Sequence, residues 1–220
     1  VKELGEVIES GQLKKAVLSK FLKESAEACV LLERSLGQAA QLVTSFKQVA
    51  VDQTTAQRRK FDLAIVVQEI LATLQPRFKK TPFKLDVHTE PDILLDSYPG
   101  QLGQVISNIV INAELHGFDG RDSGTIRIET HDLGDSVRLV IQDNGNGIPQ
   151  AIQGKVFDPF FTTKMGTGGT GLGLNIVHGL VSRVLGGRIT LESTETVGTS
   201  FILELPKTAP LVVDELVDAL

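Results

Sequence analysis

The stretch Gly166–Val177 reads GTGGTGLGLNIV, and the interpretation of the 220-residue chain starts from it. Glycines and small hydroxyl side chains lead into an apolar segment typical of a helix, an arrangement that can bind phosphate through backbone amides. The first six residues also fit the G-x-G-x-x-G pattern of dinucleotide-binding folds, and Glu192 lies about where those folds place an acid. No apolar strand precedes the stretch, so the pattern alone does not identify the nucleotide.

The segment before this stretch predicts a lid. Phe157–Lys164 reads FDPFFTTK, an aromatic patch followed by hydroxyl-bearing residues. The threonine and glycine run from Thr162 to Thr170 has few side chains that could pack, so we expect it to move as a lid hinged at its glycines. The helix predicted over Gly171–Leu185 would then present its first backbone amides to phosphate.

A second polar cluster lies on the helix predicted to begin at Pro99. Asn108, Asn112 and His116 are spaced four residues apart and therefore share one helical face, where they interrupt its apolar side. A carboxamide oxygen is a suitable neutral ligand for Mg²⁺, which keeps several waters and takes other oxygens from phosphates. A helix cap or an internal hydrogen bond is the alternative interpretation, and it would be preferred for a single asparagine.

A third cluster, Asp143-Asn-Gly145-Asn-Gly147, directly follows the strand predicted over Val137–Ile141. A carboxylate at a strand end accepts a hydrogen bond from the exocyclic amine of adenine, whereas guanine presents an acceptor at that position. The glycines would let the backbone come close to the base. On its own, this sequence would be a turn more often than a binding site.

The order of the predicted elements indicates an α+β fold. Apolar residues recur at helical spacing in three segments, which run from the capping residue Asp62 to about Phe78, from Pro99, and over Gly171–Leu185. Apolar and polar residues alternate, or form short runs, in six predicted strands: Phe83–His88, Ile93–Leu95, Thr125–Thr130, Val137–Ile141, Ile189–Glu192 and Ser200–Leu205. Helices on one face of a mixed sheet make a two-layer α/β sandwich.

Residues 12–53 predict one long helix with a narrow apolar seam. Steps of four and three residues alternate along it, as in a coiled-coil heptad, at Leu18, Leu22, Ser25, Cys29, Leu32, Leu36, Ala39, Val43, Phe46 and Ala50. A seam this narrow needs a partner helix, and residues 1–9 offer only the end of one. We therefore expect a partial helical hairpin that forms a homodimer, with Cys29 as a small residue of the interface.

The composition is that of a globular protein with an acidic balance. Hydrophobic residues make up 41% and charged residues 22%, and the net charge of -5 argues against a nucleic-acid-binding surface. The single cysteine excludes an internal disulfide and fits a reducing, cytoplasmic compartment. The sequence shows no signal peptide and no membrane-spanning run, so we expect any membrane anchor to lie outside it. The basic run Gln57–Lys60 is interpreted as a solvated linker.

In their order along the chain, the four clusters resemble the N, G1, F and G2 boxes of bacterial sensor histidine kinases, in the superfamily shared with DNA gyrase, Hsp90 and MutL. The resemblance covers roughly residues 62–206. It implies an α/β sandwich that binds ATP and Mg²⁺ beneath a flexible lid, with Asn112 as the Mg²⁺ ligand, Asp143 as the adenine-binding acid, and Asn108 and His116 as catalytic positions near the phosphates. The remaining nucleotide-binding positions are then Gly145, Gly147, Phe160, Thr162, Gly169, Thr170, Gly171, Leu172 and Gly173.

Within this resemblance, position 108 separates two chemistries. Members of the superfamily that hydrolyse ATP carry a water-activating glutamate there, and an asparagine cannot take a proton. Fast hydrolysis is therefore not expected, whereas a neutral histidine is already a nucleophile near pH 7. Glu114 is off the asparagine face and is interpreted as a surface charge. Leu115 stands where the family carries a lysine, which makes His116 a candidate substitute near the phosphates.

None of the four histidines has the acidic and proline neighbours of the family's phosphoacceptor. We therefore expect a partial dimerisation hairpin over residues 1–56, an ATP-binding catalytic domain over 57–207 and a tail over 208–220. This chain would transfer the γ-phosphate of ATP to a histidine upstream of it, and the expected partner is the receiver domain of a response regulator. Two other hypotheses stay open: a degenerate, non-catalytic dimerising scaffold, and a Rossmann-type dehydrogenase.

Overall fold

The computed structural model describes residues 18–30, 57–164 and 169–211. The chain divides into two compact units, Val1–Phe46 and Lys47–Leu220, and each is described by itself. In the first unit, residues 18–30 form an α-helix, as the heptad pattern predicts. Leu18 and Leu22 of the seam are exposed on this helix, and so is Cys29. The rest of the predicted long helix lies outside the described residues.

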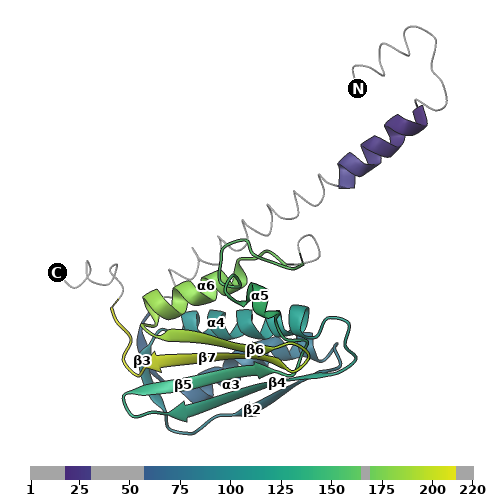
Figure 1. The fold of residues 1–220 in the computed structure, drawn as a ribbon. Coiled ribbons are helices and arrows are strands. Elements are labelled where there is room, and N and C mark those ends of the chain that lie inside the picture. Colours follow the sequence, from purple (N-terminus) through teal and green to yellow (C-terminus); the bar gives the residue numbers. More distant parts are fainter. Residues whose placement is uncertain (1–17, 31–56, 165–168, 212–220) are drawn as a thin grey trace. The chain divides into compact units, whose positions relative to one another are not determined.

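The second unit contains a five-stranded mixed sheet in the order β2-β4-β5-β7-β6 (Figure 1). Its strands are β2 (Phe83–His88), β4 (Gly124–Asp132), β5 (Ser136–Asp143), β6 (Arg188–Thr194) and β7 (Gly198–Pro206). Strands β2 and β4 are parallel, and the other neighbouring pairs are antiparallel. A dinucleotide-binding fold has a mostly parallel sheet, so the dehydrogenase hypothesis is wrong.

Three main helices accompany this sheet: α3 (Leu63–Phe78), α4 (Pro99–Asn112) and α6 (Gly173–Gly179). Helix α4 packs against both α3 and α6, and α4 and α6 lie over one face of the sheet (Figure 1). Asp62 begins α3 as predicted, because its Oδ1 accepts a hydrogen bond from the backbone N of Ile65 at 3.1 Å. Pro99 occupies the first turn of α4, where its missing N–H is not needed.

The helices differ from the prediction at their ends. Helix α4 continues into a π-helical turn over Ala113–Gly117, and α6 into another over Leu180–Val184. Helix α6 begins at Gly173 rather than at the predicted Gly171, because Gly171 has a left-handed φ of 69°. A short helix that the sequence analysis did not predict, α5 (Gln150–Gln153), lies between the sheet and α6 along the chain.

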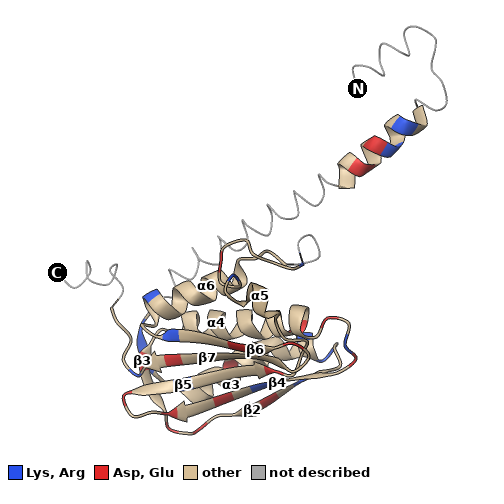
Figure 2. Ribbon diagram, in the orientation of Figure 1, with Lys and Arg blue, Asp and Glu red and all other residues tan. Residues whose placement is uncertain are grey.

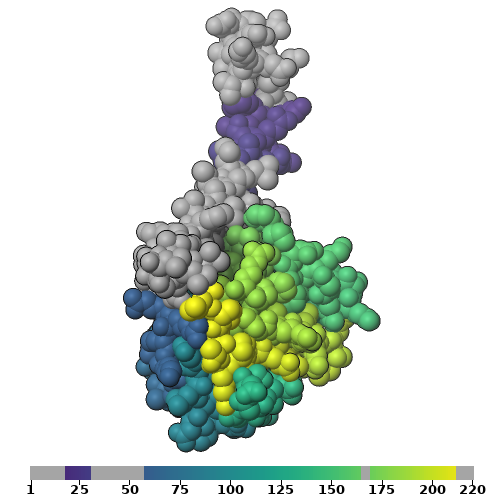
Figure 3. Space-filling model, turned by 90° about the vertical axis from the view of Figure 1, so that its left-hand side faces the viewer, coloured from purple at the N-terminus to yellow at the C-terminus, as the bar shows by residue number. Residues whose placement is uncertain are grey.

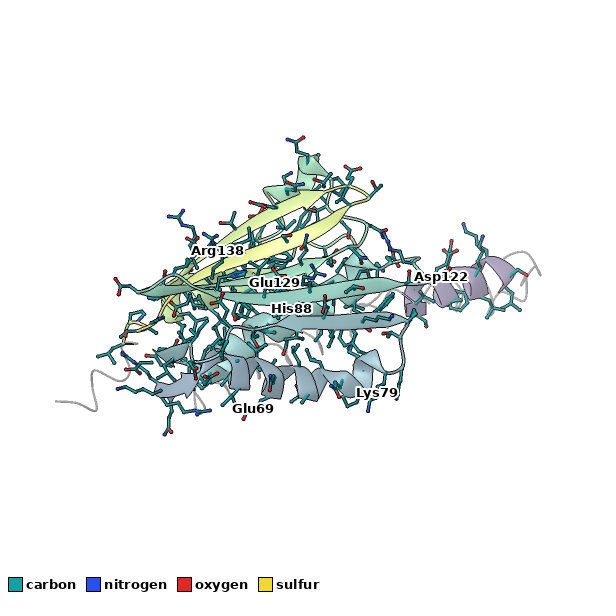
Figure 4. The ribbon with its side chains drawn as sticks, turned by 90° about the horizontal axis from the view of Figure 1, so that it is seen from below. Glu69, Lys79, His88, Asp122, Glu129 and Arg138 are labelled. Carbon is teal, nitrogen blue, oxygen red and sulfur yellow. The ribbon has the colours of Figure 1, made fainter. Side chains whose placement is uncertain are left out.

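The core lies between the helices and the inward face of the sheet. Ile126 and Ile128 of β4 are fully buried, as is Leu139 of β5, and α4 contributes Val105 and Ile106. The other face carries polar residues at the alternate positions; Figure 4 shows His88, Glu129 and Arg138 on the neighbouring strands β2, β4 and β5. Charges of both signs lie along these strands (Figure 2). The two-layer α/β sandwich expected from the sequence is confirmed.

A second, two-stranded sheet was not predicted. Strand β1 (Arg59–Asp62) pairs antiparallel with β3 (Leu94–Ser97). Arg58 donates from Nε and Nη2 to the two carboxylate oxygens of Asp96, at 2.9 and 3.0 Å. The interpretation of Gln57–Lys60 as a solvated linker is therefore wrong, because most of this run is ion-paired or part of a strand. Only one residue of β1, Phe61, is buried, so its sequence lacks the alternation that predicts strands.

Residues 207–211 connect the small sheet to the main one. Lys207 N donates to Asp135 O at 3.0 Å, and Lys207 O accepts from Asp96 N at 2.7 Å. Ala209 N then donates to Asp96 O at 2.9 Å, and the Tyr98 hydroxyl donates to Pro210 O at 3.0 Å. In the space-filling view of Figure 3, the yellow C-terminal residues lie beside the blue residues of the β1–β3 region. The first residues of the predicted tail thus pack on the domain.

Candidate nucleotide-binding site

A cavity of about 280 Å³ lies beside α4 and the start of α6. Its volume is close to the lower end of the range for small-molecule sites, about 300–1,000 Å³. Ten predicted site residues line it: Asn108, Asn112, His116, Asp143, Gly147, Thr162, Gly169, Thr170, Gly171 and Gly173. Four sequence clusters that are far apart in the chain therefore meet at one cavity, as predicted.

Asp143 reaches the cavity because it continues the inward-facing row of β5, after Val137, Leu139 and Ile141. The residue is only 5% exposed, and its Oδ1 accepts a hydrogen bond from Gly145 N at 2.8 Å. Burial raises the pKa of the Asp143 carboxyl, and hydrogen bonds from the Gly145 and Thr199 amides and the charge of Arg121 oppose this rise. A buried carboxylate beside an open cavity is an acceptor for a donor such as an exocyclic amine.

The glycines after Asp143 are required by close backbone contacts. Gly147 has a φ of 70°, and a Cβ there would overlap the Thr194 carbonyl. A Cβ at Gly145 would overlap the carbonyl of Gly117, whose own position leaves little space before the Asp143 carboxylate. These contacts hold the loop after β5 against the end of the α4 segment, and so fix the position of Asp143.

Apolar side chains line the cavity near Asp143, and the sequence analysis did not predict them. Ile148, Ile152 and Val156 come from the segment around α5, and Ile111 and Leu115 come from the α4 segment. An apolar lining with a single polar anchor is the usual environment of a flat aromatic ligand such as a purine. A signal was present in the sequence, because Ile148 and Pro149 directly follow Gly147.

The carboxamides lie at the other part of the cavity. Asn108, Asn112 and His116 all line it, which confirms that they share one face of the α4 segment. The start of α6 lies against this face, since a Cβ added at Gly173 would be 3.6 Å from Asn112 Nδ2. The amide of Asn112 and the backbone at the start of α6 are therefore near one another, as a site for Mg²⁺ and phosphate requires.

Two segments form the neck of the predicted lid, Phe160–Lys164 and Gly169–Gly171. Gly169 N donates to Lys164 O at 3.3 Å, and Lys164 N donates to Thr162 Oγ1 at 3.1 Å. Gly171 packs directly on the backbone of Phe160, which has no room for a Cβ. Phe160 has a φ of 66° and is 58% exposed, an unusual backbone for an aromatic residue. Residues 165–168 lie outside the described residues, so the mobility of the lid stays a prediction.

His116 is the ionisable group at this part of the cavity. Its Nδ1 lies 3.3 Å from the Thr163 hydroxyl. Burial lowers the pKa of the His116 imidazole, the positive charge of Lys164 lowers it further, and Asp119 opposes both. His116 is therefore mostly neutral near pH 7 in the nucleotide-free protein, and it is poorly suited to replace a lysine as a fixed cation.

Glu114 points away from the cavity. Its carboxylate pairs with the guanidinium of Arg77 on α3, and it is not among the cavity residues. Glu114 is therefore an interhelical ion pair rather than a base for water, although it is more buried than the predicted surface charge. Three predicted nucleotide-binding residues, Gly145, Phe160 and Leu172, do not line the cavity either. They lie one step behind it, next to residues that do.

The search for other sites in the described parts of the chain is short. No group of three His, Cys, Asp or Glu side chains among the described residues is arranged to hold a metal ion. Among the same residues, no helix is both long and apolar enough to cross a membrane.

Comparison with known proteins places this cavity in a family. Residues 98–209 match the family of histidine kinase-, DNA gyrase B- and HSP90-like ATPases. The alginate biosynthesis sensor protein KinB of Pseudomonas aeruginosa is 30% identical over 195 residues, which are 84% of this chain and 32% of KinB. The sensor histidine kinase RcsC of Escherichia coli is 32% identical over 172 residues, which are 74% of this chain and 17% of RcsC. The chain thus spans a third or less of these relatives.

A solved structure gives the same result for the domain alone. The catalytic domain of histidine kinase ThkA, in a nucleotide-free form, superposes with a TM-score of 0.62 at 32% identity. The match covers 69% of this chain and 97% of the ThkA domain. The cavity lies within the matched family region, with Asp143, Asn112 and the glycines of the loops around it. This chain therefore belongs to the histidine kinase-, DNA gyrase B- and HSP90-like ATPases, as an ATP-binding catalytic domain of the histidine kinase type.

Proposed function

We propose that the cavity binds ATP together with Mg²⁺, with adenine against Asp143 and the phosphates toward Asn112 and His116. The observation that carries this proposal is one cavity in which a buried carboxylate, an apolar lining and the carboxamide face of α4 are combined. Asn112 offers one neutral oxygen ligand, and a Mg²⁺ ion would take its remaining oxygens from phosphate and water. When bound, the ion would neutralise charge on the phosphates.

The proposed reaction is transfer of the γ-phosphate to a histidine other than the four in this chain. A bond from phosphorus to the imidazole nitrogen forms as the bond to the β,γ-bridging oxygen breaks, and ADP leaves. His88 is bound by Asp86 at 2.8 Å and His131 lies 3.4 Å from Glu90, both on the sheet face away from α4. His178 packs beside the ring of Phe157 at 5.5 Å. An in-line approach of any of these to the cavity is therefore not available.

Asn108 supports transfer over hydrolysis, because its carboxamide lines the cavity and cannot accept a proton from water. The other acid of this helix end, Glu114, is held by Arg77. A neutral imidazole needs no base to become a nucleophile. The intact cavity also counts against the alternative of a non-catalytic scaffold, which nucleotide titration would separate from the kinase.

The proposed partners follow from the relatives and from the seam. A response-regulator receiver domain would take the phosphoryl group from the acceptor histidine. The exposed seam residues Leu18 and Leu22 support a homodimer through the helix over 18–30. A cytoplasmic location is proposed, because ATP and a reducing environment suit a chain with one cysteine.

Incubation with γ-labelled ATP tests the proposed reaction. This chain alone should acquire no acid-labile, base-stable label, and a helical-hairpin fragment that carries an acceptor histidine should acquire it when both are present. The transfer should be slow, because the two parts are not tethered. Acid-labile label on this chain alone, removed by His116→Ala or His178→Ala, would contradict the placement of the acceptor.

A further inference from the structure

The cavity needs a positive charge that its lining does not provide. Among the described residues, no lysine or arginine lines it, and its only ionisable side chains are His116 and Asp143. Asp143 is an acid, and His116 is mostly neutral near pH 7 because burial and the charge of Lys164 lower its pKa. A triphosphate carries several negative charges, of which one Mg²⁺ ion neutralises two. A cation beside the lining is therefore the missing component of the site.

Lys164 is the cation that the geometry places there. Thr162 and Thr163 immediately before it line the cavity, and so does Gly169, whose amide hydrogen-bonds to the Lys164 carbonyl. Its charge also acts on His116, a residue of the lining. The backbone of Lys164 is thus fixed on both sides by residues of the site, at the neck of the predicted lid.

The side chain of Lys164 is held by Asp119. The distance from Nζ to Asp119 Oδ1 is 2.6 Å, and Asp119 follows His116 by three residues, just after the π-helical end of the α4 segment. Asp119 is the more exposed partner, with 60% of its side chain accessible against 23% for Lys164. An ion pair with so exposed a carboxylate contributes little to stability, so little is lost when the lysine changes partner.

We propose that Lys164 leaves Asp119 when ATP binds and donates to the phosphates, so that it supplies the cation of the phosphate site. A lysine ammonium on a flexible stem can make such a change without movement of its fixed backbone. A charged donor to phosphate makes a stronger hydrogen bond than a neutral one. This inference rests on the proposed binding of ATP, and it adds a residue outside the cavity lining to that site.

Opposite effects of two variants test the exchange. Wild type, Lys164→Gln and Asp119→Asn are titrated with Mg-ATP and with adenosine, and Lys155→Gln, an exposed lysine after α5, serves as the matched control. Lys164→Gln should weaken Mg-ATP binding about tenfold or more and leave adenosine binding unchanged. Asp119→Asn removes the competing carboxylate, so it should bind Mg-ATP as tightly as wild type or up to about fivefold more tightly. Lys155→Gln should behave as wild type.

A further variant separates charge from folding. Lys164→Arg keeps the charge and should stay within about threefold of wild type for Mg-ATP, so a loss in Lys164→Gln alone points to the charge. Equal weakening by Lys164→Gln and Asp119→Asn would mean that the ion pair is merely structural, and would overturn the exchange. Mg-ATP binding by Lys164→Gln at wild-type strength would overturn it too, with ATP binding itself intact. Failure of wild type to bind Mg-ATP would overturn both the inference and the proposed function.

Discussion

Asp143 shows how a single functional residue can be predicted from sequence. The alternation Val137, Leu139, Ile141, Asp143 places the acid on the inward face at the end of β5, and the structure has it there. Residues joined across the fold could not be predicted in this way. The pairs Lys164–Asp119 and Arg77–Glu114 each join distant positions of the chain, and neither depends on a local periodicity. The sequence therefore predicted the anchors of the site better than the contacts that orient them.

The raised pKa of Asp143 leads to a pH dependence of adenosine binding. The carboxylate is the stronger acceptor for the exocyclic amine, and in the folded protein it becomes protonated at a pH above the usual range for aspartate, about 3.9. Adenosine affinity should therefore fall as the pH decreases through this raised pKa. Titration of adenosine between about pH 4 and pH 7 measures it, and Asp143→Asn should bind weakly with no such dependence. A pH-independent affinity in wild type would contradict this role of Asp143.

The sign for stability is opposite to that for binding. Because the pKa of Asp143 is raised on folding, the folded state takes up its proton more readily than the unfolded state. The free energy of unfolding of wild type, relative to that of Asp143→Asn, should therefore decrease as the pH rises through the raised pKa. The ionised residue is thus retained at neutral pH for binding, at the expense of stability.

The helices and strands followed from the sequence where an element has its own periodicity or cap. Strand β2 begins and ends at the predicted residues, and α3 begins after Asp62 as predicted. Strand β1 and helix α5 were missed for a physical reason. β1 depends on pairing with β3 and on the ion pair of Arg58 with Asp96, and α5 is one turn with no buried residue. Tertiary contacts, not local preference, determine such elements.

The cap of α3 gives a test at the scale of an element. Asp62→Ala removes the acceptor for Ile65 N, and it should lower the free energy of unfolding by about 1 kcal/mol. Asp62→Asn keeps a side-chain oxygen of equal capping ability, so its stability should match that of wild type. Denaturant unfolding of the three proteins measures this. A loss in Asp62→Asn as large as in Asp62→Ala would mean that charge, rather than capping, is responsible.

At the scale of the whole molecule, the seam predicts self-association through the helix over 18–30. Leu22 is 58% exposed on this helix, where a partner helix would cover it. Leu22→Lys would bury a charge in that interface and should shift the protein toward monomers without change in ATP affinity. Glu27→Lys, an exposed change on the opposite face of the helix, is the matched control. Sedimentation measures both, and a wild-type chain that is monomeric at high concentration would contradict the proposal.

The central claim is that this cavity recognises adenine through Asp143 and the phosphates through Asn112. Calorimetric titration of wild type with Mg-ATP and Mg-GTP is its most direct test, with Asp143→Asn and Asn112→Ala measured alongside. The account predicts that wild type prefers ATP, and that Asp143→Asn loses about ten- to a hundredfold of ATP affinity, and with it the discrimination, as expected when a charged hydrogen bond is removed. Asn112→Ala should weaken Mg-ATP binding and keep adenosine binding. Equal ATP affinities of wild type and both variants would contradict the account.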